Sequence, residues 1–140
     1  MDLATLMLIA YRAMDERVIA AMREAGFDVT VAQARIAQRI AEDGSRLTDL
    51  AEQAQVTKQT ASLLVAALER EGLVERIADP DDGRARLIRF TQRGKAASRR
   101  AREVVMGVEQ EWNDHLGPEL AACLRQALTK LRDIADPYRS

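Results

Sequence analysis

The side chains with the clearest chemistry lie in residues 57–62, a short polar stretch that opens a predicted helix. Successive steps of 100° around this helix give it an apolar side made of Ala61, Leu64, Val65 and Leu68. The opposite side carries Lys58, Gln59, Ser62 and Ala66. Glutamine can bond two atoms of adenine, lysine reaches guanine or phosphate, and serine pairs with either kind of group. This edge is typical of a helix that reads bases in duplex DNA, and a solvated surface face is the alternative.

A second feature is a run of positive charge between residues 83 and 102. It contains no acidic residue and eight basic ones: Arg84, Arg86, Arg89, Arg93, Lys95, Arg99, Arg100 and Arg102. Because the whole chain has a net charge of −1, this block is a local feature that suits the phosphates of nucleic acid. A guanidinium at a hairpin tip, as predicted for Arg84, fits the narrow minor groove. For Arg99, Arg100 and Arg102 a solubilising helix face is the alternative.

Residues suited to catalysis or metal binding are scarce. His115 is the only histidine and Cys123 the only cysteine, which excludes a cysteine-based metal cluster, an internal disulfide and a histidine-rich site. No glycine-rich phosphate loop follows a predicted strand, and the Gly-x-Ser-x-Gly pattern is absent. We therefore expect no enzyme, no metal and no cofactor. Cys123 lies beside Leu120 and Leu124, where we expect a buried thiol rather than a redox sensor.

The elements that position these side chains follow from apolar spacing and capping residues. The spacing predicts a helix from Leu3 to Gly26, and a second from Thr30 through Ile36 and Ile40 to residues 43–44. A third helix is predicted to be capped by Thr48, and a fourth to run from Thr57 to Gly72. Residues 73–78 and 85–90 are predicted strands around the turn-forming residues 79–84. Two further helices are expected from Thr91 to about Asn113 and from Pro118 to Pro137.

This order of elements predicts a mainly α fold. It contains a winged helix-turn-helix, with a two-stranded β-wing and a helical dimerisation domain. The 140 residues suffice for one domain, residues 1–140. Within it, we assign residues 30–91 to the DNA-binding part, and residues 1–25 and 92–140 to the dimerisation part. A winged helix that binds proteins, or a scaffold that touches no DNA, is the alternative; it predicts an acidic or apolar recognition face.

Three segments resemble the MarR family of bacterial transcription regulators. Residues 47–51 read LTDLA, residues 56–62 read VTKQTAS, and residues 68–76 read LEREGLVER. The most specific likeness is in the wing, where DPDDGR at 79–84 is followed by LIRFTQRG at 87–94. The order of the remaining helices also fits, so the resemblance extends over essentially the whole chain.

The resemblance implies a role for each part of the molecule. The recognition helix would enter the major groove, and the Asp82 carboxylate would steady Arg84, which enters the minor groove. Together with the residue chemistry above, this gives the candidate DNA-binding residues Thr57, Lys58, Gln59, Thr60, Ser62, Asp82, Arg84 and Arg86. The first, fifth and sixth helices would form a homodimer that places two recognition helices on a pseudo-palindromic operator, usually to repress transcription.

The apolar stripes of the first and last helices favour dimerisation independently of the resemblance. The last helix carries Leu120, Leu124, Leu128, Leu131 and Ile134 on one side, more apolar surface than a small winged unit covers. Packing within one subunit is the alternative. Residues 1–4 lack the features of a signal peptide, and no uncharged apolar run approaches about 18 residues. We therefore expect a cytoplasmic protein with no membrane partner.

Members of the family often release DNA when a small aromatic or phenolic acid binds between the two parts. A pocket for such an effector could draw on Tyr11, Phe27, Arg35, Trp112 or His115. Of these, the candidate ligand-binding residues are Tyr11, Arg35, Trp112 and His115. Each has another explanation. Tyr11 and Trp112 suit ordinary packing, and His115 suits the negative end of a helix dipole.

Overall fold

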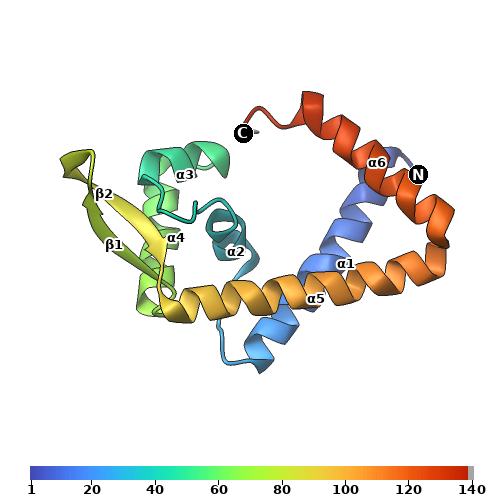
Figure 1. Cartoon of the computed structure of the whole chain (residues 1–140), viewed down its shortest axis with the longest axis horizontal. Coiled ribbons are helices and arrows are strands. Elements are labelled where there is room, and N and C mark those ends of the chain that lie inside the picture. Colours follow the sequence, from blue (N-terminus) through green and yellow to red (C-terminus); the bar gives the residue numbers. More distant parts are fainter. Residues whose placement is uncertain (139–140) are drawn as a thin grey trace.

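The computed structural model describes residues 1–138, and this range forms six helices and a two-stranded sheet. The elements are α1 (Leu3–Glu24), α2 (Val31–Ala37), α3 (Leu47–Gln53), α4 (Lys58–Arg70), β1 (Val74–Asp79), β2 (Asp82–Phe90), α5 (Gln92–Leu116) and α6 (Pro118–Ala135). The long helix α5 connects the hairpin and α2–α4 at one end to α6 and the start of α1 at the other (Figure 1). The predicted mainly α fold with a winged helix-turn-helix is confirmed.

The winged unit, residues 30–91, is stabilised by helix-capping hydrogen bonds and by pairing between its two strands. Thr57 caps α4, as predicted, because its hydroxyl oxygen accepts a 3.0 Å hydrogen bond from the Thr60 amide. The two strands pair antiparallel, from Val74 opposite Phe90 to Asp79 opposite Asp82, with a register shift near Asp79. Ser45, which lies two residues before α3, exchanges two main-chain hydrogen bonds with Ile88 of β2, at 2.9 and 2.8 Å. The base of the wing is therefore joined directly to the segment that leads into α3.

The core of this unit lies between α2, α3, α4 and the base of the wing. Its largest fully buried side chains are Ile36, Leu50, Val65, Leu68 and Ile88. Burying each of these side chains stabilises the fold by about 1.5–3 kcal/mol. The core therefore fixes the inner side of α4, and the outer side of this helix is available to contact another molecule.

The junction between the wing and α5 is tightly hydrogen-bonded. Thr91 caps α5, as predicted, and also donates from its hydroxyl to the Gly72 carbonyl at 2.6 Å. The next basic residue, Arg93, donates to the carbonyls of Glu71 and Gly26 and stacks 4.8 Å from the ring centre of Phe27. This arginine therefore links α5 to both the end of α4 and the loop after α1.

The other end of the molecule is apolar but uncovered. Leu3 and Leu6 of α1 are 65% and 51% exposed, and the predicted stripe of α6 is exposed at every position. Polar contacts join these helices to α5: Arg17 forms a bidentate pair with Glu111, and Arg125 lies 2.7 Å from Glu109. Within residues 1–138, no helix is both long and apolar enough to cross a bilayer.

The structure corrects the predicted ends of the second and third helices. The helix α2 ends at Ala37, several residues before the predicted stop at 43–44, and Ile40 is buried in the turn that follows. Hydrogen bonds from the Arg39 and Ile40 amides to carbonyls three residues earlier tighten this turn. The N-cap of α3 is Arg46 rather than Thr48, because the Ser45 pairing with β2 keeps the chain extended only up to that point.

Three smaller predictions also change. The second strand begins at Asp82 rather than Ala85, so the acidic turn is shorter and the predicted wing arginine lies in the strand. The helix α5 continues to Leu116, where Gly117 with a φ of 84° ends it. Cys123 is exposed, and the prediction of a buried thiol is wrong for the single chain, because α6 buries none of its described side chains.

Candidate nucleic-acid interface

The start of α4 presents a polar surface with no acidic group in its first turn. Thr57, Lys58, Gln59 and Thr60 are all exposed, and Ser62 is partly exposed. Their inner neighbours Ala61, Val65 and Leu68 are buried. The predicted division of the helix into an apolar inner side and a polar outer edge therefore agrees with the observed burial.

One exposed residue of this helix was missed by the analysis of polar side chains. Leu63 is 67% exposed, whereas its neighbours in the sequence, Ser62 and Leu64, are half-buried. At 100° per residue it falls on the outer side of α4, between Gln59 and Ala67. The helical period alone predicts this exposed position, but leucine has no hydrogen-bonding or charged group that would mark it as a DNA contact. We call Gln59, Leu63, Ala66 and Ala67 the outer face of α4.

The tip of the wing is fixed by a long-range ion pair that the sequence did not reveal. Arg46 donates from Nε and Nη2 to one carboxylate oxygen of Asp79, at 3.0 and 2.8 Å. Asp79 is only 6% exposed, and its other oxygen accepts from the Asp81 amide at 2.9 Å. The Asp81 amide and the Arg46 guanidinium together lower the pKa of Asp79 below its usual value. The start of α3 therefore anchors the turn of the wing.

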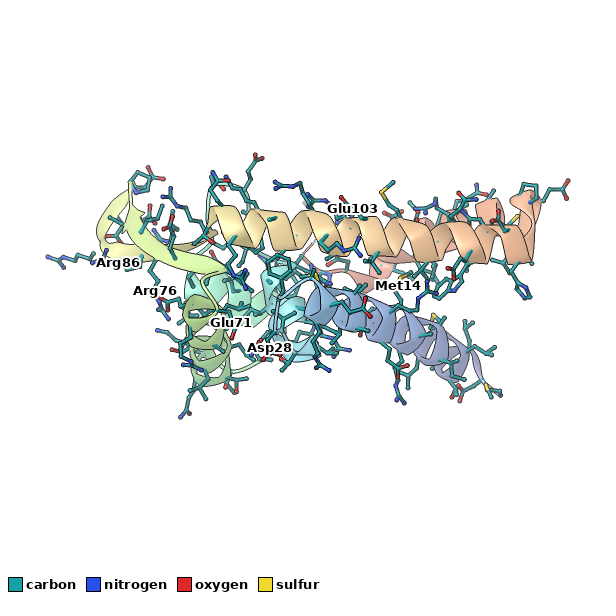
Figure 2. The ribbon with its side chains drawn as sticks, turned by 90° about the horizontal axis from the view of Figure 1, so that it is seen from below. Met14, Asp28, Glu71, Arg76, Arg86 and Glu103 are labelled. Atoms are coloured by element: carbon teal, nitrogen blue, oxygen red, sulfur yellow. The ribbon has the colours of Figure 1, made fainter. Side chains whose placement is uncertain are left out.

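The predicted partnership of Asp82 and Arg84 takes a specific form. The Asp82 carboxylate accepts a 3.1 Å hydrogen bond from the main-chain amide of Arg84 rather than from its guanidinium. Asp82 therefore shapes the backbone at the wing tip. In the described part of the chain, the guanidinium of Arg84 has no hydrogen bond or ion pair. Arg84 and Arg86 are both exposed, and Arg86 points away from the body of the molecule (Figure 2).

The basic block divides into paired and unpaired side chains. Arg89 contacts Glu75 at 2.7 Å, and Arg93 binds main-chain carbonyls. Arg100 lies 3.4 Å from Glu103, the first acidic residue after the block, and Arg102 donates to the Ser98 hydroxyl at 3.1 Å. These arginines support the fold or the local helix surface. Among residues 1–138, Arg84, Arg86, Lys95 and Arg99 have no such partner. The charge available to a polyanion is therefore concentrated on the wing and on one part of α5.

The four candidate effector residues do not converge on one place. Arg35 and Tyr11 are neighbours, with the guanidinium carbon 5.4 Å from the ring centre, and Arg35 also lies 3.6 Å from Asp15. Trp112 lines a groove of about 330 Å³ between α5 and α6, and His115 is exposed near the end of α5. These four side chains therefore occupy three separate places on the protein.

A separate apolar cavity lies between α1, α2, α4 and α5. It measures about 100 Å³, and its lining includes Ile19, Met22, Ala34, Phe90 and Ala97. None of the four candidate effector residues lines it. Within residues 1–138, no group of three or more His, Cys, Asp or Glu side chains could hold a metal ion.

Residues 27–85 match the model of the MarR family, and no curated protein sequence matches the chain. The transcriptional regulator Tm0710 from Thermotoga maritima is 26% identical, with a TM-score of 0.66 over 94% of this chain and 91% of that one. A MepR mutant from S. aureus, bound to an oligodeoxyribonucleotide, is 24% identical, with a TM-score of 0.64 over 95% and 97%. CouR from Rhodococcus jostii RHA1, bound to p-coumaroyl-CoA, is 22% identical, with a TM-score of 0.76 over 99% and 95%.

Proposed function

We propose that this chain is a DNA-binding transcription regulator of the MarR family, whose model matches residues 27–85, and that it is a homodimeric repressor of a pseudo-palindromic operator. Proteins of this family are regulators and not enzymes. Each subunit would insert the start of α4 into a major groove and the wing arginine into the neighbouring minor groove. The protein would act in the cytoplasm, where its operator lies.

The observation that carries the proposal is the pairing of an acid-free recognition edge with an arginine-tipped wing. Lys58 and Gln59 are exposed at the start of α4, and Arg84 and Arg86 are exposed on the wing. Exposed guanidinium groups without carboxylate partners are suited to phosphates and to the negative potential of a narrow groove. A surface that docks onto a basic or apolar protein would need acidic or extended apolar side chains at the same positions.

The proposed homodimer is supported by the uncovered apolar sides of α1 and α6. Leu120, Leu124 and Leu128 lie one turn apart on α6 and are 57%, 46% and 48% exposed. Burying side chains of this kind against a second copy would stabilise the dimer by about 1–2 kcal/mol each. A two-fold axis through this end would present two recognition helices about 34 Å apart, one turn of DNA.

An effector would release the operator by binding where the two parts of the subunit meet. The apolar cavity between α1, α2, α4 and α5 joins helices of both parts, so a ligand there can bias their relative positions. CouR, with the same fold, is bound to p-coumaroyl-CoA, and the p-coumaroyl group of that ligand supports an aromatic or phenolic effector. Tyr11 and Arg35 are the adjacent pair available to a second, more polar ligand position.

The proposal is tested by selecting fragments of genomic DNA that bind the purified protein, followed by footprinting and sedimentation. We expect a dimer of about twice 15.6 kDa that protects two half-sites. Arg84→Ala should weaken operator binding by about 1–3 kcal/mol at fixed salt. Arg12→Ala is the matched control, because Arg12 is an exposed arginine on α1 whose carboxylate partner is Glu16 of the same helix.

Three results would contradict the proposal. A clean monomer would remove the two-half-site geometry. Equal affinities of the Arg84→Ala and Arg12→Ala variants would remove the wing from the interface. Absence of any salt-dependent binding to DNA would favour a winged helix that binds proteins instead.

A further inference from the structure

We propose that Leu63 reads a thymine methyl group in the major groove and so fixes an A·T pair in each operator half-site. This inference rests on the proposed function, because it concerns the same helix. It assigns a specificity role to a side chain that has neither a donor, an acceptor nor a charge.

The position of Leu63 separates it from the other exposed apolar residues. Apart from Met106 on α5, these lie on or just before α1 and on α6, at the end of the molecule assigned to the second copy. Leu63 lies at the other end, on the outer face of α4, and is 67% exposed. A single exposed leucine is common in proteins and does not by itself indicate a function. Here it occupies the side of the helix that the proposed interface would cover.

The neighbours of Leu63 make it the protruding apolar group on this face. Ala66 and Ala67, three and four residues later, are small, and Gln59 lies one turn earlier. The inner side of the helix is fixed by Ala61, Val65 and Leu68, so Leu63 cannot turn inward without unpacking the core. The tip of its side chain would therefore meet the groove floor before the flanking alanines do.

Only one group in the major groove matches an isobutyl side chain. Each base pair presents donors and acceptors there, and thymine alone adds an apolar C5 methyl. Placing Leu63 against the amino or carbonyl edge of any other base would desolvate a polar atom without a partner. The same argument excludes a phosphate contact, since Leu63 offers nothing to an anion.

The spacing on the helix adds a second constraint. Gln59 and Leu63 are four residues apart, which is about 6 Å along the helix axis. Base pairs are stacked about 3.4 Å apart, so the two side chains reach positions one to two base pairs from each other. Glutamine bonds the N6 and N7 atoms of adenine. Each half-site is therefore expected to contain an adenine for Gln59 and, one or two steps away, a thymine for Leu63.

The test removes the methyl group from the DNA and the isobutyl group from the protein. Thymines of the selected operator are replaced singly by deoxyuridine, symmetrically in both half-sites, and affinities are measured for the wild type and Leu63→Ala. One buried methyl corresponds to about a fourfold change per half-site, or about fifteenfold for both. We expect one thymine at which the wild type loses about this factor, while the Leu63→Ala variant loses nothing further.

Two further variants separate reading from structure. Leu63→Met keeps an apolar side chain and should retain the sensitivity to deoxyuridine. Met106→Ala removes a methionine of similar exposure, 69%, from α5 and should leave the sensitivity unchanged. If Leu63→Ala weakens binding equally on thymine and deoxyuridine operators, or if no thymine methyl matters to the wild type, the inference is overturned while the proposed function stands. If the wild type binds no DNA at all, both are overturned.

Discussion

Replacing Gly94 by alanine tests whether the contact between α5 and the base of the wing is as close as the structure has it. Gly94 lies in the first turn of α5 and is buried. A Cβ atom at this position would overlap the carbonyl oxygen of Leu73, and would lie 2.9 Å from both the Leu73 carbonyl carbon and the Phe90 Cδ1 atom. Ordinary contacts between carbon atoms are about 3.5–4.0 Å. The helix or the wing must therefore move to admit the methyl group.

The magnitude follows from two opposing effects. Overpacking of a fixed site costs about 1–3 kcal/mol and sometimes more. Alanine regains about 1 kcal/mol of helix propensity. The Leu73 carbonyl has little freedom to move, since it accepts a 3.1 Å hydrogen bond from the Thr91 amide. We therefore place the steric cost at the upper end and expect a net loss of about 2 kcal/mol in the free energy of unfolding.

The chain offers a matched control in the same helix. Gly107→Ala adds the same methyl group to α5, but no atom lies within 4 Å of the added Cβ. This variant should gain about 0.5–1 kcal/mol, because alanine loses less backbone entropy on folding. Urea denaturation followed by circular dichroism, at one protein concentration because of the proposed dimer, measures both changes. Equal stability of the two variants would refute the close contact at Gly94, and a loss in Gly107→Ala would show that a second copy covers that position.

Two further predictions concern the interface and the wing. Lys58→Ala should lower the slope of log affinity against log salt by about one per subunit if Lys58 meets a phosphate, or relax base preference if it meets guanine. Lys130→Ala on α6 is its control, and an unchanged slope and preference for Lys58→Ala would remove that residue from the interface. Asp79→Asn tests the wing anchor through pH. Because the folded pKa of Asp79 is lowered, its contribution is present above the ordinary value near 3.8 and is lost as the pH falls through the lowered pKa. The stability difference between wild type and Asp79→Asn should shrink below about pH 4 in urea titrations, and a constant difference would contradict the ion pair.

The sequence alone determined the features that depend on residues close together in the chain. Three such features could be predicted: the caps at Thr57 and Thr91, the hairpin between residues 74 and 90, and the polar edge at Lys58 and Gln59. The caps arise from hydrogen bonds across three residues, the hairpin from the turn-forming residues between its strands, and the polar edge from helical periodicity. The wing motif at residues 79–84 carries the most specific resemblance to the MarR family, whose model matches residues 27–85.

Only the tertiary structure decided which charges and apolar groups remain free. Arg46 meets Asp79 across 33 positions. The cap of α3 is Arg46 rather than Thr48, because the β-bridge between Ser45 and Ile88 keeps the chain extended up to Arg46. Nothing in the basic block itself distinguishes Arg89, which pairs with Glu75, from Arg84, whose guanidinium has no partner among residues 1–138. Pairing and exposure depend on distances between segments far apart in sequence. Those distances are fixed only when the core packs, so composition and spacing could not supply them.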